Sequence, residues 1–292
     1  MRQPFVIKEI TMYKCGLVLE GGGSRGIYTS GILDAFMEKG VKFPYVIGVS
    51  MGACNAVSYL GNCPRRQHDI IIDYINDKRY MSFSNLFKKG EYLDSDWLFG
   101  ELSYDIAPIN QDEFERSGAV FCAVVTNAKT GKPEYLYPKS LRERGCPEVR
   151  ASCSLPLATK GVDIGGEIYF DGGITDSIPL ERALEDGCEK AVVIMTQHKG
   201  FQKQPYNEGV LKMIKKYPLV RAGLQDRHNV YNAQLEYVNM IAEQGRAMII
   251  QPPTELDCST LEKSTAKLEA IYRLAYKQGL EIADKVKEYI EG

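Results

Sequence analysis

The sequence predicts an α/β protein whose central sheet is mainly parallel. Short apolar runs rich in β-branched residues recur at residues 15–19, 45–49, 120–125 and 191–195. They lack the alternation of strands with one solvated face, as expected of strands covered on both sides. Stretches with helical periodicity lie between them, for example over residues 27–39. Strands that alternate with helices are typical of a parallel sheet covered by helices.

The later elements change from strands to helices along the chain. Gly165-Gly166 separates short strand patterns at residues 162–164 and 168–170, which is typical of a hairpin. Beyond about Lys199, helical patterns predominate. The last one carries an apolar stripe that must dock on another surface, formed by Leu268, Ile271, Ala275, Ile282 and Val286. We therefore expect a main domain over residues 14–200 and a helical C-terminal region over residues 201–292 packed on it.

Composition excludes several classes of protein. The net charge is −2 over 292 residues, which gives no electrostatic case for binding nucleic acid. The eight cysteines form no C-x-x-C pair and have no nearby histidine cluster, so we expect no metal. The N-terminal residues lack the apolar core of a signal peptide, and no run reaches the 18 apolar residues of a membrane span. We expect a cytoplasmic protein, with peripheral contact at a membrane left open.

The pentapeptide Gly48-Val49-Ser50-Met51-Gly52 predicts a nucleophile. In a G-x-S-x-G elbow, the serine lies on a sharp turn between a strand and a helix, with its hydroxyl exposed. Gly48 and Gly52 meet the need for small residues on both sides of that turn. The context fits, because a strand pattern precedes Ser50 and a helical pattern follows it.

The glycine turn Gly21-Gly22-Gly23-Ser24-Arg25-Gly26 follows the first predicted strand. Glycines let backbone amides approach an anion closely at the start of a helix. Gly21, Gly23 and Gly26 also fit the dinucleotide fingerprint G-x-G-x-x-G, but the acidic residue expected about 20 positions later is missing. Paired with the elbow at Ser50, the turn is better interpreted as an oxyanion hole.

A third motif, Asp171-Gly172-Gly173, closes the predicted hairpin. The sequence resembles the patatin-like phospholipase family, whose pattern is a G-G-G-x-R-G turn, a G-x-S-x-G elbow and a D-G-G or D-G-A motif in this order. The segment 150–156 also resembles the loop before that family's aspartate. The likeness covers roughly residues 14–199.

The resemblance implies a three-layer α/β/α fold and a lipid acyl hydrolase with a Ser50–Asp171 dyad that needs no metal or organic cofactor. The amides near Gly22 and Gly23 would stabilise the oxyanion. Arg25 would brace the turn or face a phosphate head group, and a salt bridge to a nearby carboxylate is the alternative. Lipid or ester substrates are the expected partners. The aromatic-rich segment 79–104, which includes Trp97 and Phe99, is expected to cover the acyl site.

Two alternative functions stay open at this point. In an α/β-hydrolase with a Ser-Asp-His triad, His198 would follow in the required chain order. His68 and His228 lie in polar surroundings, and we expect them to be exposed. A nucleotide-binding protein using the glycine turn is the second alternative.

Overall fold

An eight-stranded sheet forms the middle of the protein in a computed structural model that describes residues 12–292. The N-terminal residues 1–11, on which the expectation about a signal peptide falls, lie outside the described part. The strand order is β5-β6-β3-β2-β1-β7-β8, with β4 paired to β3. The strands are β1 (Gly16–Leu19), β2 (Tyr45–Val49), β3 (Val120–Asn127), β4 (Pro133–Leu136), β5 (Val162–Ile164), β6 (Glu167–Asp171), β7 (Ala191–Ile194) and β8 (Ala247–Ile250).

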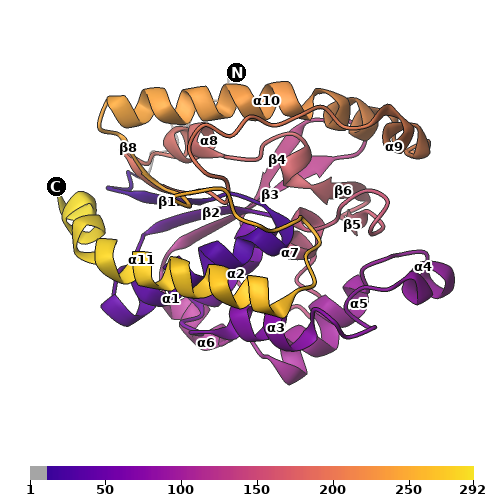
Figure 1. Cartoon of the computed structure of the whole chain (residues 1–292), viewed down its shortest axis with the longest axis horizontal. Coiled ribbons are helices and arrows are strands. Elements are labelled where there is room, and N and C mark those ends of the chain that lie inside the picture. Colours follow the sequence, from indigo (N-terminus) through magenta and orange to yellow (C-terminus); the bar gives the residue numbers. More distant parts are fainter. Residues whose placement is uncertain (1–11) are drawn as a thin grey trace, which may run out of the picture.

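Helices cover both faces of this sheet, which confirms the predicted three layers (Figure 1). On one face lie α8 (Leu180–Glu185) and α10 (Pro218–Glu243), and on the other lie α1 (Ile27–Lys39), α2 (Met51–Leu60), α3 (Arg66–Tyr74) and α11 (Thr265–Glu291). The remaining helices are α4 (Phe83–Lys89), α5 (Ser95–Trp97), α6 (Gln111–Arg116), α7 (Pro147–Ser152) and α9 (Glu208–Met213). A π-helical stretch, η2 (Leu98–Ile106), continues α5, and single 3₁₀ turns, η1 (Gly23–Gly26) and η3 (Gly172–Ile174), follow β1 and β6. No helix within residues 12–292 combines the length and apolar character needed to cross a membrane.

The sheet is parallel through its centre, as predicted. β3, β2, β1, β7 and β8 run parallel, while β4, β5 and β6 join antiparallel at the β3 side. The hairpin of β5 and β6 turns through Gly165 and Gly166, which both have positive φ, as the tight hairpin turn requires.

Two strands were not predicted from the sequence. β4 begins with a proline and its four residues are all half-buried, so it lacks the apolar run that identifies a buried strand. β8 lies in the C-terminal region and pairs in parallel with β7. The helical C-terminal region therefore also extends the sheet of the main domain, and the division near residue 200 stays a prediction.

The last helix docks through the apolar stripe that the sequence predicted. Leu268, Ile271, Ala275 and Val286 are buried, and Ile282 is half-buried against the same core. The partner of α11 is α1, and small residues allow the two backbones to approach closely. A Cβ atom on Gly31 of α1 would lie 2.6 Å from the Tyr272 carbonyl oxygen of α11.

Substitution of Gly31 by alanine should therefore destabilise the protein. Because the added methyl group meets backbone atoms, α11 must shift, and we expect Gly31→Ala to lower the free energy of unfolding by about 1–3 kcal/mol. Gly100→Ala is the matched control, since a Cβ at helical Gly100 would meet no atom within 4 Å. Urea denaturation measures both variants, and equal stabilities would contradict the close packing of α1 on α11.

Candidate active site

Ser50 lies on the turn between β2 and α2 with φ of 54° and ψ of −125°. A non-glycine residue at positive φ is strained, at a cost of about 1–3 kcal/mol that surrounding contacts must offset. The turn is tight: a Cβ on Gly48 would lie 2.7 Å from the carbonyl carbon of Gly52, and one on Gly52 would lie 2.4 Å from the Leu19 carbonyl oxygen. The Ser50 amide donates to the Ser152 hydroxyl at 2.9 Å. Ser152, at the end of α7, thus fixes the elbow and was not singled out in the sequence.

Asp171 reaches the same region because β3 pairs with both of the strands involved. Val124 of β3 pairs with Val49, the residue before Ser50, and Val125 pairs with Asp171. Val49 and Asp171 therefore lie opposite successive residues of β3, and Ser50 directly follows Val49. Gly172 permits this arrangement, since a Cβ there would lie 2.2 Å from the Val124 carbonyl oxygen.

The Asp171 carboxyl is almost fully buried, with 2% of the residue exposed. Its Oδ1 accepts a hydrogen bond from the Gly173 amide at 2.7 Å. Its Oδ2 is buried and has no hydrogen-bond partner among the described residues. Burial raises the pKa of Asp171, and the Ser50 hydroxyl, the Arg227 guanidinium and the Gly173 amide oppose that rise. Asp171 Oδ2 is thus free to accept a proton. The Ser50 hydroxyl is close enough to lower the pKa of the carboxyl.

The glycine turn lies against the elbow. A Cβ on Gly21 would lie 3.1 Å from the Ser50 Cβ, and one on Gly26 would lie 2.3 Å from Met51 Cγ. Gly23 has φ of 56°, and a Cβ there would meet the Thr260 carbonyl oxygen at 2.3 Å. The Ser24 amide donates to that same carbonyl at 2.9 Å, whereas the amides of Gly22 and Gly23 donate to no acceptor among residues 12–292.

Glu20, which the sequence analysis missed, holds this turn in place. It directly follows β1 and is buried. Its carboxylate accepts hydrogen bonds from the Thr196 amide at 2.6 Å and from the Tyr231 hydroxyl at 2.7 Å. The Thr196 hydroxyl in turn donates to the Gly21 carbonyl at 3.1 Å. An acidic residue at the carboxyl end of a central parallel strand is the signal that could have identified it.

Arg25 braces the turn from the other side. Its guanidinium donates to the Cys258 carbonyl at 3.3 Å and to the Thr260 hydroxyl at 3.4 Å. No carboxylate of the described chain lies within ion-pair distance of it, so the alternative of a salt bridge is not found.

Two cavities of different character meet at Ser50. One is apolar, with a volume of about 120 Å³, and lies among α2, α3, η2 and α7. Val57, Ile71, Leu102 and Val149 are among its lining residues. The other is polar, with a volume of about 320 Å³, and contains Ser50, Asp171 and the glycine turn. Within residues 12–292 no group of three or more His, Cys, Asp or Glu residues is placed to hold a metal ion.

The aromatic segment 79–104 divides into three parts around the apolar cavity. Tyr80 and Phe99 line the cavity. Trp97 is buried but does not line the cavity. Its ring packs near Tyr74, with ring centroids 5.8 Å apart. Phe83 and Phe87 of α4 are exposed. The segment contributes two of its rings to the wall of the cavity and leaves two in solvent.

His198 lines neither cavity beside Ser50. Its ring packs near Phe201, with centroids 6.1 Å apart, and its Nδ1 is buried without a partner among the described residues. The geometry therefore offers no support for the triad. The expectation that His68 is exposed is wrong: it is buried between Asp69 and Glu269, with nitrogen–oxygen distances of 2.7 Å to each. The local sequence did not indicate this burial, because Glu269 lies on α11, far from His68 in the sequence.

Comparisons with known proteins identify relatives of similar sequence. The chain is 31% identical over 198 residues to the uncharacterized protein YjjU of Escherichia coli, covering 66% of this chain and 55% of that protein. It is 25% identical over 201 residues to the probable lipid hydrolase 463L of Invertebrate iridescent virus 6, covering 62% and 67%. It is 26% identical over 184 residues to lysophospholipase NTE1 of Candida glabrata, covering 59% and 10%. The chain thus matches about half of the first relative and a small part of the fungal one.

A solved structure, VipD from Legionella pneumophila, superposes with a TM-score of 0.44 at 15% identity, covering 93% of this chain and 67% of that one. Residues 217–291 match the model of a domain of unknown function, DUF6363. Residues 17–184, more than half of the chain, match the family model of patatin-like phospholipase. The predicted family is thereby confirmed: this chain belongs to the patatin-like phospholipases.

Proposed function

We propose that the protein is a serine acyl hydrolase that cleaves carboxylic esters of lipids, with Ser50 as nucleophile and Asp171 as base. One observation carries the proposal: the strained Ser50 directly follows the partner of Val124, and Asp171, a buried carboxyl with a free oxygen, pairs with the next β3 residue, Val125. The relatives named lipid hydrolase and lysophospholipase support the same class of reaction.

The reaction would proceed through an acyl-enzyme. Asp171 Oδ2 accepts the proton of the Ser50 hydroxyl while Oγ attacks the ester carbonyl carbon. The amides of Gly22 and Gly23 donate to the oxyanion of the tetrahedral intermediate. The intermediate collapses, the C–O bond to the alcohol breaks, and the alcohol leaves with the proton held by Asp171. Water, deprotonated by Asp171, then attacks the acyl-enzyme and releases the fatty acid and Ser50.

The two cavities support a lipid substrate. The apolar cavity begins at Ser50 and would take the acyl chain, whose burial contributes about 0.8 kcal/mol per methylene group. The polar cavity on the other side of Ser50 would take the alcohol part. This division matches the two ends of a lipid ester.

Removal of the proposed base should abolish most of the activity. Asp171→Asn preserves shape but cannot accept the proton, so we expect turnover of a chromogenic acyl ester to fall on the order of 10³-fold or more, as loss of a triad member does. Ser50→Ala should abolish labelling by a fluorophosphonate probe. Turnover and labelling of both variants are compared with those of wild type, after thermal denaturation has shown that the three proteins are equally stable.

His198→Ala is the control that separates the dyad from the triad, and we expect its turnover to stay within a few-fold of wild type. The opposite pattern, an inactive His198→Ala and a mildly impaired Asp171→Asn, would show that a triad with His198 as base catalyses the reaction. Labelling that persists in Ser50→Ala would reject Ser50 as nucleophile.

We further propose that α4 contacts a lipid surface. Phe87 and Phe83 are 88% and 70% exposed, and Lys88 and Lys89 follow at the end of the helix. The helix lies apart from the sheet at one extremity of the molecule (Figure 1). Met81 and Leu93, which lie on either side of the helix in the sequence, form a β-bridge, and both line the apolar cavity. Insertion of the two rings would therefore bring the cavity to the membrane.

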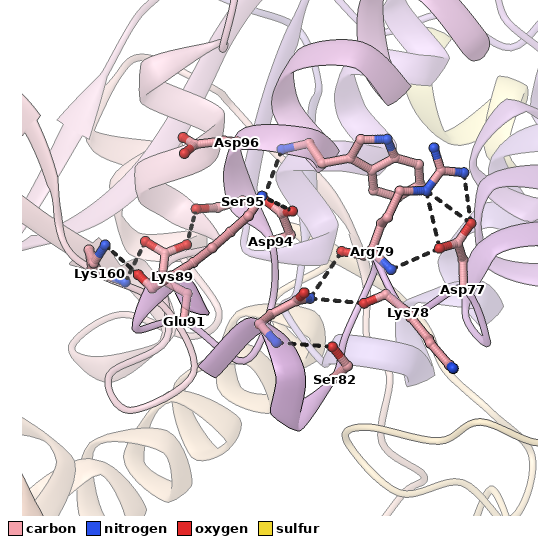
Figure 2. Close-up of polar contacts among 12 residues, drawn as sticks. Asp77, Lys78, Arg79, Ser82, Lys89, Glu91, Asp94, Ser95, Asp96 and Lys160 are labelled. Atoms are coloured by element: carbon pink, nitrogen blue, oxygen red, sulfur yellow. Dashed lines mark hydrogen bonds and ion pairs between the residues drawn. The ribbon is translucent and has the colours of Figure 1, made fainter. Parts of the chain in front are cut away.

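A network of polar contacts holds the two ends of the segment 82–95, which carries α4 (Figure 2). Buried Glu91 accepts hydrogen bonds from the Ser95 hydroxyl at 2.6 Å and the Lys160 amide at 3.2 Å. At the start of α4, the Ser82 hydroxyl accepts from the Asn85 amide at 3.1 Å, and Lys89 pairs with Asp94 at its end. These two ends are thus fixed, so that the exposed rings are presented on an ordered helix.

Substitution of Phe87 should separate binding at a surface from chemistry. With its ring in lipid, Phe87→Ser should lower hydrolysis of esters in anionic vesicles about 10-fold while leaving a water-soluble short-chain ester within two-fold. Phe99→Ala, in the cavity wall, is the matched control and should impair long-chain esters in either presentation. Equal rates of Phe87→Ser and wild type on vesicles, with equal sedimentation of both proteins with vesicles, would reject this contact.

A further inference from the structure

The polar cavity beside Ser50 collects three cations from distant parts of the sequence. Arg25 comes from the glycine turn, Lys203 from the segment after β7, and Arg227 from α10. α10 runs along the face of the sheet opposite α1 and α11 (Figure 1). The proposed reaction uses none of these three side chains as acid, base or nucleophile.

None of the three cations has a carboxylate within ion-pair distance in the described chain. Arg227 donates to the Gly173 carbonyl and, at 2.8 Å, to the Tyr206 hydroxyl. Lys203 Nζ lies 4.2 Å from the centroid of the Tyr231 ring. Arg25 Nε is buried without a partner. The cluster thus keeps donors that no protein anion satisfies.

Burial and the neighbouring arginines both disfavour the charged form of Lys203. Burial, with Arg227 and Arg25 adding to it, lowers the pKa of Lys203 to about 8, and Glu20 opposes this effect. The Glu20 carboxylate accepts hydrogen bonds from Thr196 and Tyr231, and it forms no ion pair with Lys203 in the described chain. An anion between these side chains would relieve the repulsion and restore the charge on Lys203.

We propose that the C-terminal region completes a head-group subsite, in which Lys203 and Arg227 together with Arg25 bind the phosphate of a lipid ester. This inference rests on the proposed function and names its substrate class. Charged donors bind phosphate through short, charge-assisted hydrogen bonds, and arginine matches its oxygens bidentately. With its phosphate here, such a lipid presents its ester to Ser50 and its acyl chain to the apolar cavity.

The subsite assigns a role to the part of the chain outside the patatin-like match. Lys203 follows the matched residues 17–184, and Arg227 lies within residues 217–291, the domain of unknown function. The backbone of Lys203 is fixed to α10, since Asn232 accepts from its amide at 2.8 Å and donates to its carbonyl at 3.2 Å. The C-terminal region therefore positions both cations beside the nucleophile.

Three cations also predict which phosphate is preferred. A phosphate monoester has a second pKa near 6 and carries close to two negative charges above pH 7. A phosphocholine group carries one negative charge and a cation that the cluster would repel. We expect kcat/KM to fall from a lysophospholipid with a terminal phosphate, to its phosphocholine analogue, to a neutral monoacylglycerol with the same acyl chain.

The test measures kcat/KM for these three substrates below their micelle concentrations. Lys203→Gln should lower the ratio of the phosphate monoester to the neutral ester about 10- to 100-fold, as loss of a charged hydrogen bond does. Lys203→Arg keeps the charge and should keep most of the ratio. Lys199→Gln is the matched control, because exposed Lys199 lines no part of the cavity, and its ratio should equal that of wild type.

A ratio that Lys203→Gln leaves unchanged, or an equal loss on all three substrates, would overturn the subsite. Should Lys203→Gln fail to fold, the wild-type ratio decides. Since kcat/KM reports the free enzyme, this ratio should fall as pH rises through the Lys203 pKa near 8, and a ratio that is flat from pH 7 to 9 would contradict the proposal.

Two further arms separate the possible failures. Inorganic phosphate should inhibit wild type competitively and Lys203→Gln more weakly. If phosphate inhibits but the enzyme shows no preference for phosphate-bearing lipids, free phosphate and not a head group is the ligand. That result overturns the inference. Loss of the subsite leaves the proposed function intact if the neutral ester is still hydrolysed through Ser50. An enzyme inactive on every ester would reject both.

Discussion

The pairing of β3 with two other strands is the constraint on which the whole site depends. Because Val124 pairs with Val49 and Val125 with Asp171, one strand sets the spacing between the proposed nucleophile and its base. A slip of one residue would turn the Asp171 side chain to the other face of the sheet. The buried, two-sided core around β3 makes such a slip costly, so the packing of the sheet maintains the geometry of the reaction.

A second constraint comes from the C-terminal region, which reaches the site at several points. Thr260 contacts the glycine turn and Arg25, and Tyr231 of α10 donates to Glu20 at the base of that turn. Arg227 donates to the Gly173 carbonyl, next to the proposed base. The region therefore supports the oxyanion turn and the aspartate turn simultaneously. Packing alone does not describe its role.

The fold and the reactive residues were predictable to the extent that local sequence dictates them. The elbow at Ser50 needs small neighbours and a strand before it, and both leave a visible pattern. Asp171 could be identified only with the other motifs, because an aspartate before glycines is also common in plain turns. Lys203 and Arg227 escaped, since cations on a loop and a helix show no pattern until the fold brings them together. β8 escaped because it is a short apolar run among helical patterns, and periodicity alone does not distinguish such a run from part of a helix.

The central claim is that Asp171 takes the proton of Ser50 directly, and the pH dependence of labelling by a fluorophosphonate tests it. The carboxylate is the active form and burial raises its pKa, so the labelling rate should fall as pH falls, with a midpoint above the ordinary value of about 3.9. We predict that His198→Ala keeps this acid limb and that Asp171→Asn labels slowly without it. An acid limb that survives in Asp171→Asn but disappears in His198→Ala would contradict the account.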